Sequence, residues 1–107
     1  MRSEILKGHL ETLLLAALDE APSHGYAVIE SLRERSYGQF DLPEGTVYPA
    51  LHRLERDGLL ESDWDAGSGR KRRVYRLTQD GKRALAAQKS EFRSFVGGMA
   101  AVLGVSG

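Results

Sequence analysis

Apolar residues near the start of the chain recur at helical spacing and predict a helix over residues 4–19. The main stripe consists of Leu6, Leu10, Leu13, Leu14 and Ala17. Ile5, Leu15 and Ala16 lie off this stripe, and Leu15 is nearly opposite to it. A helix with apolar residues on two sides is covered on two sides, and in so small a domain we expect a partner subunit to supply the second cover.

A second helix is predicted after the break at Pro22, with Ser23 as its candidate N-cap and an end near Ser36. The residues expected to face inward are Tyr26, Ile29 and Leu32. Residues 37–43 then form a connector that ends in a proline.

Residues 44–58 predict a third helix, and Pro49 constrains where it begins. Proline is harmless in the first helical turn, where backbone N–H groups lack partners, and is costly further in. If Thr46 is the N-cap, Pro49 falls in that first turn. If the helix begins instead at residue 43 or 44, we expect a kink near Pro49. Gly58 supplies the stop.

Two short strands joined by a loop are predicted next, over residues 59–65 and 71–77. One face of the first strand holds Leu60, Ser62 and Trp64. The other face holds Leu59, Glu61, Asp63 and Asp65. On the return strand, Tyr75 and Leu77 share a face, because side chains alternate along a strand.

A long last helix, capped by Thr78, is predicted to extend to about residue 103. Its apolar stripe consists of Ala84, Leu85, Phe92, Phe95, Val96, Met99, Val102 and Leu103. Gly97 and Gly98 fall on the opposite face, so the stripe continues past them and the glycine pair forms a soft spot.

Three helices followed by a β-hairpin form the winged helix-turn-helix arrangement, here in the order α-α-α-β-β-α. The predicted fold class is therefore mainly α with a small β-hairpin. In this arrangement the third helix normally enters the DNA major groove, while the hairpin, or wing, reaches the backbone or the minor groove.

The third helix offers a suitable outer face. Opposite its core side lie Pro49, His52, Arg53 and Arg56, with Tyr48 on the flank. Arginine can bind phosphate or guanine, and histidine and tyrosine can form hydrogen bonds with DNA. This face carries no acid, because Glu55 and Asp57 fall to its two sides. An ordinary solvated face is the alternative, since every amphipathic surface helix has one.

Charge strengthens the DNA-binding hypothesis at the wing. The chain balances 15 Lys and Arg against 15 Asp and Glu, yet the stretch GRKRRVYRLT contains five basic residues. Each cation placed on a phosphate releases condensed counterions and makes binding fall with salt. The predicted DNA-binding wing consists of Gly67, Ser68, Gly69, Arg70, Lys71, Arg72 and Arg73.

Acids on the opposing strand are expected to pair with part of this basic run. Because Glu61, Asp63 and Asp65 lie there, we expect the cations at 70–72 to point outward more freely than Arg73 or Arg76.

Other classes of function find little support. The absence of cysteine excludes disulfides, thiol catalysis and thiolate metal sites. His9, His24 and His52 lie on three different predicted helices without metal-site spacing, and no nucleotide-binding loop or nucleophile elbow is present. We therefore expect no enzyme, no metal and no cofactor. A winged helix that binds another protein instead of DNA is the alternative, because the fold alone does not decide between them.

The chain contains no apolar run long enough for a membrane span, and its first residues lack the apolar core of a signal peptide. We therefore expect a cytoplasmic protein.

The chain resembles the PadR family of bacterial transcriptional regulators, in its short, single-domain form. The matching segments are LKGHLETLLLAAL (6–18), HGYAVIESL (24–32), EGTVYPALHRLERDGLLES (44–62), Trp64 and RKRRVYRLTQDGKRAL (70–85). The resemblance implies that Thr46, Tyr48 and Pro49 face DNA at the start of the recognition helix, with residues 67–73 as the wing. It places His24, Gly25 and Tyr26 at the start of the second helix, whose N-terminus can receive a backbone phosphate. A core position is the alternative for Tyr26.

The resemblance also implies a homodimeric repressor of an operator with dyad symmetry, often released by a small aromatic or lipophilic effector. Residues 1–78 would form the DNA-binding domain, residues 79–103 the dimerisation helix, which packs with the partner's first helix, and residues 104–107 a tail. The expected interface consists of Leu6, Leu10, Leu14, Leu15, Leu85, Phe92, Phe95, Val96, Met99 and Leu103. Some short family members place a tryptophan on this helix to stack on an effector. Here the stripe carries Phe92 and Phe95 instead, which we expect to form dimer core.

Overall fold

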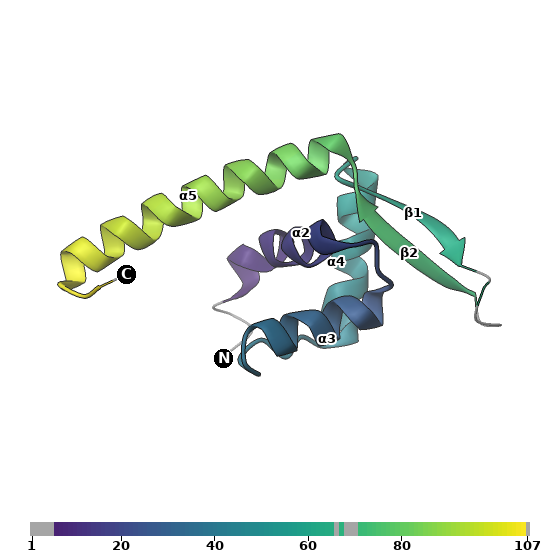
Figure 1. The fold of residues 1–107 in the computed structure, drawn as a ribbon, viewed down its shortest axis with the longest axis horizontal. Helices are drawn as coiled ribbons and strands as arrows, with labels where there is room; N and C mark the ends of the chain where they lie inside the picture. Colours follow the sequence, from purple (N-terminus) through teal and green to yellow (C-terminus); the bar gives the residue numbers. More distant parts are fainter. Residues whose placement is uncertain (1–5, 66, 68–70, 107) are drawn as a thin grey trace.

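The computed structural model describes residues 6–65, 67 and 71–106, and within them the elements follow the predicted order (Figure 1). In chain order they are η1 (Lys7–His9), α2 (Leu10–Glu20), α3 (Gly25–Arg35), α4 (Glu44–Arg56), β1 (Leu60–Asp65), β2 (Arg72–Leu77) and α5 (Gln79–Leu103). The two strands pair antiparallel. The predicted fold class, a mainly helical winged helix with a small hairpin, is confirmed.

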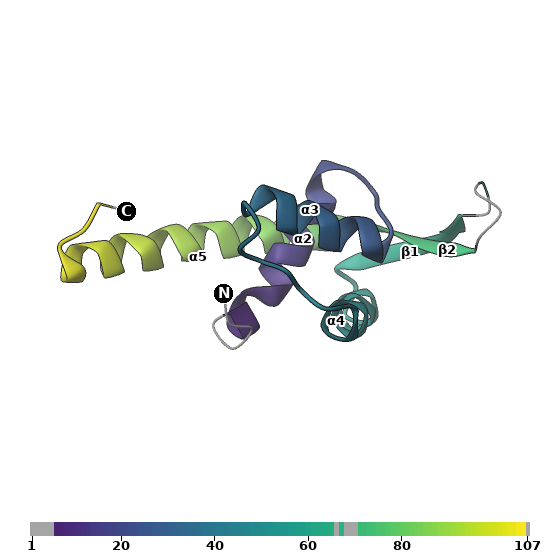
Figure 2. The same ribbon diagram turned by 90° about the horizontal axis from the view of Figure 1, so that it is seen from below.

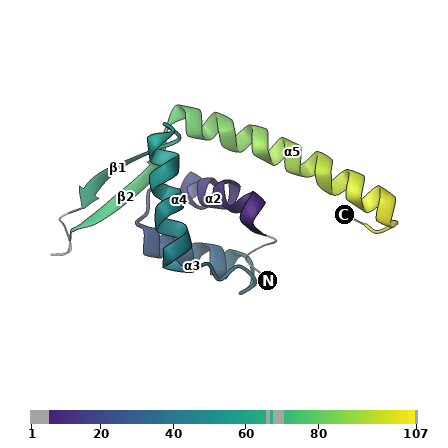
Figure 3. The same cartoon turned by 180° about the vertical axis from the view of Figure 1, so that it is seen from behind.

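The hydrophobic core lies among α2, α3 and α4, and the hairpin and the start of α5 close it. α4 packs against α2, α3 and β1, and α5 packs against α2 (Figures 1 and 3). The residues without any exposed surface include Leu14, Leu15, Val47, Ala50, Leu51 and Leu54. Because α4 buries one side in this core, its orientation is fixed and its opposite side faces outward.

The first helix differs from the prediction in its start and in what covers it. Residues 7–9 form a 3₁₀ turn, and the α-helix begins at Leu10. Leu15, which was expected to face a partner, is 0% exposed within the single chain, because β2 and α5 also pack against α2. The same chain therefore supplies the second cover, and the prediction of a partner over Leu15 is wrong.

The second helix begins one residue later than predicted. His24, and not Ser23, is the N-cap of α3, because the backbone of Ser23 pairs with Tyr75 of β2 in an isolated bridge. Ile29 is buried as predicted, whereas Tyr26 is 54% exposed. The prediction that Tyr26 faces inward, into the core, is therefore wrong. The residue lies on the outer side of the first turn of α3, where a hydrogen bond with the Glu30 carboxylate raises the pKa of its hydroxyl.

The sequence allows two starts for the third helix, and α4 has the earlier one, near residue 44. Pro43 is the N-cap and Glu44 the first residue, so Pro49 lies in the second turn and cannot donate to the Gly45 carbonyl. The helix nevertheless continues through Pro49 to Arg56. Gly58 ends it as predicted, with φ +80°, and the Leu59 amide then bonds to the Leu54 carbonyl at 2.9 Å.

The hairpin and the last helix agree closely with the sequence pattern. Leu60 pairs with Leu77 and Ser62 with Tyr75, so the predicted faces are confirmed. The Thr78 hydroxyl accepts a hydrogen bond from the Gly81 amide at 3.0 Å and caps α5, which runs unbroken to Leu103. Figure 2 shows α5 projecting to one side of the helical body and the hairpin to the other. No helix among the described residues is long and apolar enough to cross a membrane.

Candidate nucleic-acid interface

The outer side of α4 presents the side chains that the helical pattern predicts there. Pro49, His52, Arg53 and Arg56 are exposed, and Tyr48 is half-buried. Within the described part of the chain, Arg53 forms no ion pair, and the Arg56 guanidinium lies 3.8 Å from Asp57 in an exposed contact of little strength. This side of the helix therefore carries two arginines that are available to an anionic partner.

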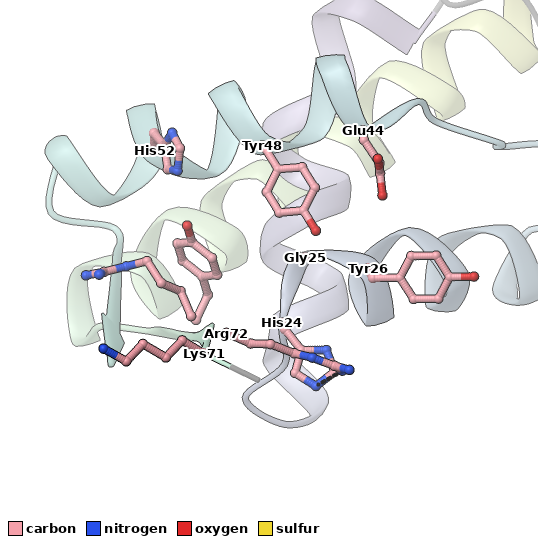
Figure 4. A pocket seen from close by; sticks show the side chains of 10 residues that line it. His24, Gly25, Tyr26, Glu44, Tyr48, His52, Lys71 and Arg72 are labelled. Atoms are coloured by element: carbon pink, nitrogen blue, oxygen red, sulfur yellow. Dashed lines mark hydrogen bonds between the residues drawn. The ribbon is translucent and has the colours of Figure 1, made fainter. Parts of the chain in front are cut away.

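A cavity of about 690 Å³ lies beside α4, between the start of α3 and strand β2. Figure 4 shows Tyr48 reaching from α4 toward Gly25, with Lys71 and Arg72 on the strand side. Residues that line it include His24, Gly25, Glu44, Tyr48, His52, Lys71 and Arg72. The lining thus combines three cations, since Arg73 also contributes, with two histidines, three tyrosines and the carboxylate of Glu44.

His24 contributes a buried nitrogen to the wall of this cavity. Its Nε2 lies 3.5 Å from a guanidinium nitrogen of Arg72, and an arginine can only donate. Its Nδ1 is buried and has no hydrogen-bond partner among the described residues. The first-turn N–H groups of α3 also lack helical acceptors, so donors gather at this end of the helix.

Gly25 allows Tyr48 to take its position, a contact that the sequence pattern did not reveal. A Cβ added to Gly25 would overlap the Tyr48 ring. The ring packs directly on the backbone of α3, and this packing positions its hydroxyl over the cavity. The HGY segment and the TVYP segment are thus parts of one surface.

The basic residues of the hairpin are of two kinds. Some are open to solvent or to the cavity, and others form hydrogen bonds or ion pairs with neighbouring side chains. Lys71 is exposed and Arg72 is half-buried beside His24. At the turn, the Gly67 amide donates to the Asp65 carboxylate at 3.0 Å. The predicted wing residues Ser68, Gly69 and Arg70 lie outside the described residues.

Arg76 and Arg73 are held by neighbours, as the sequence predicts. Arg76 bonds to Asp63 at 2.7 Å and to Glu61 at 2.9 Å, and these hydrogen bonds raise its pKa. Arg73 donates to Ser62 at 2.9 Å and lies over the Trp64 ring. Arg73, which the sequence places in the DNA-binding set, therefore has internal partners.

The long α5 carries an exposed apolar stripe. Phe92 and Phe95 are 50% and 55% exposed, and Met99 and Leu103 are also exposed. Val96 is half-buried, and the remaining predicted interface residues, Leu6, Leu10, Leu14, Leu15 and Leu85, are buried within the single chain. They offer almost no area to a partner, so the candidate dimer surface narrows to the far part of α5.

A second cavity, of about 1080 Å³, lies between this stripe, residues 7–13 and α4. Its aromatic lining includes His9, Phe40, Phe92 and Phe95. Thr46 and Arg53 of α4 line the opposite side. The cavity therefore touches both α5 and α4. No group of His, Asp and Glu in the described ranges could hold a metal ion.

Comparison with known sequences identifies the family. A model of the transcriptional regulator PadR-like family matches residues 14–87. An uncharacterized protein of Lysinibacillus sphaericus is 32% identical over 93 residues, which cover 86% of this chain and 85% of that protein. A transcriptional regulator of Mycobacterium tuberculosis is 47% identical over 62 residues, which cover 58% of this chain and 55% of its own.

Solved structures agree with this match. A PadR family transcriptional regulator from Eggerthella lenta superposes with a TM-score of 0.82 at 35% identity, covering 94% of this chain and 86% of that one. A PadR family regulator from Clostridium difficile gives 0.80 at 34% identity, covering 89% of this chain and 98% of the other. The matched family consists of regulators and not of enzymes, which confirms the prediction that this chain has no catalytic role.

Proposed function

The chain belongs to the PadR-like family of transcriptional regulators, and from this premise we propose that it acts in the cytoplasm as a homodimeric repressor that binds an operator with dyad symmetry. The observation that carries the proposal is the joint surface of α4 and the wing. Tyr48, His52 and Arg53 offer base and phosphate contacts, and Lys71 and Arg72 extend the same positive surface.

Within this surface, the cavity at the start of α3 suits a backbone phosphate. Helix N-termini favour anions because their first N–H groups are free and the helix dipole is positive there. Lys71 and Arg72 add two cations, and the Tyr48 hydroxyl adds a donor. We assign the phosphate to this cavity and the bases to the outer side of α4.

Dimerisation is supported by the exposed stripe of α5. A single chain leaves Phe92, Phe95 and Met99 in water, and burial of such side chains stabilises by about 25 cal/mol per Å² of apolar area. A second copy of α5, related by a two-fold axis, covers this stripe with an equivalent one. The two recognition helices then meet DNA about one turn, ~34 Å, apart.

A small aromatic or lipophilic effector would suit the second cavity. Its lining of Phe92, Phe95 and His9 favours flat apolar molecules, and Thr46 and Arg53 bring the site to the recognition helix. An effector that binds more tightly when α4 is turned away from DNA would lower operator affinity.

The test removes Lys71 and Arg72, two cations that line the proposed phosphate cavity, and measures DNA binding as a function of salt. Lys71→Ala/Arg72→Ala should weaken binding to every sequence, and the slope of log affinity against log salt should shrink by about 1.8, because each phosphate contact contributes about 0.9. The matched control, Lys82→Ala/Lys89→Ala, removes the same charge from exposed positions on α5 and should leave the slope unchanged. An unchanged slope in the wing variant, measured by fluorescence anisotropy, would contradict the proposed interface.

A further inference from the structure

Glu55 is an acid of the recognition helix that points toward the hairpin. Its Oε2 accepts a hydrogen bond from the Ser62 hydroxyl at 2.7 Å. Arg73 donates from Nε to the same hydroxyl at 2.9 Å, and another guanidinium nitrogen lies 4.0 Å from Glu55. A half-buried chain of Glu55, Ser62 and Arg73 thus joins α4, β1 and β2.

Trp64 completes this cluster. It lies opposite Arg73 in the strand ladder, and the Arg73 guanidinium lies 4.7 Å from the centre of its ring. A flat cation stacks well on an indole, so the ring fixes the plane of the guanidinium while Ser62 fixes its direction. We call these four residues, Glu55, Ser62, Trp64 and Arg73, the wing brace.

The brace connects the two elements that must meet the same DNA. In the proposed function, α4 enters a groove while the wing grips the backbone, so binding requires a fixed relation between them. A hairpin that is already held in place loses less conformational freedom on binding than one that must be ordered. A negative charge close to DNA nevertheless opposes binding by Coulomb repulsion.

We propose that Glu55 is a positioning residue that strengthens DNA binding although it is an acid, because through Ser62 and Arg73 it holds the wing at the angle that the recognition helix needs. This inference rests on the proposed function. Arg73 then serves the interface indirectly, and its guanidinium makes no phosphate contact.

Two effects of Glu55 on affinity have opposite signs, which makes the test sharp. Glu55→Gln removes a negative charge, so electrostatics alone predicts tighter binding. The brace predicts binding about three- to tenfold weaker, with an unchanged salt slope, as expected when one member of a coupled network is lost. The control, Asp57→Asn, removes the same charge from the end of the same helix and should bind at least as tightly as the parent. Glu55→Gln binding as tightly as the parent, or more tightly, overturns the inference.

Two further variants separate positioning from contact. Ser62→Ala changes no charge, yet it breaks the bridge and should weaken binding to the same extent. Arg73→Lys keeps the positive charge but loses the planar guanidinium. It should also weaken DNA binding, with no change in the slope of affinity against salt. Two results together would contradict the brace and identify Arg73 as a phosphate contact. Arg73→Lys would bind DNA like the parent, and Arg73→Ala would lower the slope of log affinity against log salt by about 0.9.

A readout in free protein distinguishes failure of the brace from failure of the proposed function. Trp64 is the only tryptophan in the chain, so its emission reports on the stacked guanidinium. Glu55→Gln and Ser62→Ala should shift that emission while thermal unfolding stays cooperative, and Asp57→Asn should not. Unchanged emission in both brace variants refutes the brace, whereas absent sequence preference in the parent refutes the proposed function.

Discussion

At the scale of single residues, the site depends on one close approach between two helices. The backbone of α3 meets the Tyr48 ring at Gly25, and no side chain larger than hydrogen fits there without moving the ring. The ring is the mobile partner, because it is the end of a side chain and not a piece of backbone. The residue type at position 25 therefore controls where the Tyr48 hydroxyl lies.

Gly25→Ala is expected to impair DNA binding while leaving the fold intact. The added methyl group displaces Tyr48 from its position, and the loss of one good base or phosphate contact, roughly 1–3 kcal/mol, weakens binding about five- to 150-fold. Anisotropy titrations and thermal unfolding measure the two effects separately.

Gly8→Ala is the matched control, since a Cβ at Gly8 meets nothing within 4 Å. It should bind DNA like the parent. Parental affinity in Gly25→Ala as well would show that the position of Tyr48 has no part in recognition.

The exposed side of α4 could be predicted residue by residue, and the roles of the basic residues only in part. Helical spacing places His52, Arg53 and Arg56 opposite the core, because a helix wheel needs no tertiary information. The partners of Arg73 depend on which residue the strand register sets across from it and on a carboxylate from another element. The sequence indicated that Arg73 would be less free, and it could not name Glu55.

At the scale of elements, two glycines of α5 have opposite roles. Gly81 lies in the first turn, where a Cβ would overlap the backbone carbonyl of Leu59. Gly97 lies mid-helix, and a Cβ there meets nothing within 4 Å. The first glycine permits the close docking of α5 on the turn between α4 and β1, and the second only weakens the helix.

The same substitution at these two positions should therefore change stability in opposite directions. Gly81→Ala forces two backbones apart and should destabilise by about 1–3 kcal/mol, the usual effect of overpacking. Gly97→Ala should stabilise by about 0.5–1 kcal/mol, because alanine loses less freedom than glycine in a helix interior. Urea unfolding measures both, and a loss of stability in Gly97→Ala would show that the glycine pair serves a contact instead.

The strands and the last helix could be predicted closely, whereas helix starts could not. The alternation in 59–65 and the cap at Thr78 are local signals, and both are confirmed. The start of α3 moved because Ser23 pairs with β2, a partner about fifty residues away in the sequence. Leu15 was assigned to a partner because a sequence pattern shows that a face is covered without showing by what.

At the scale of the whole molecule, the chain is extended for its length. Its radius of gyration is 15.0 Å, whereas a compact domain of this size has about 13 Å. The excess comes from α5, which leaves the core after Leu85 and carries its apolar stripe into water. This stripe is the surface that the proposed dimer would cover.

Phe95→Glu is expected to convert the proposed dimer into a monomer. A charge in the middle of an apolar interface loses its hydration without gaining a partner, so the variant should sediment at the monomer mass where the parent sediments at twice that mass. Ser90→Glu, which places the same charge on the opposite side of α5, is the control and should remain dimeric. A parent that is monomeric at micromolar concentration would contradict the proposed dimerisation through α5.

The most direct test of the account is selection of the parent protein's preferred sites from random duplex DNA. The account predicts enrichment of an inverted repeat whose half-sites lie about one helical turn, ~10 base pairs, apart, since two α4 helices related by a two-fold axis read one site each. Recovery of sequences with no common motif, or of a single unrepeated motif, would contradict a dimeric, sequence-specific regulator.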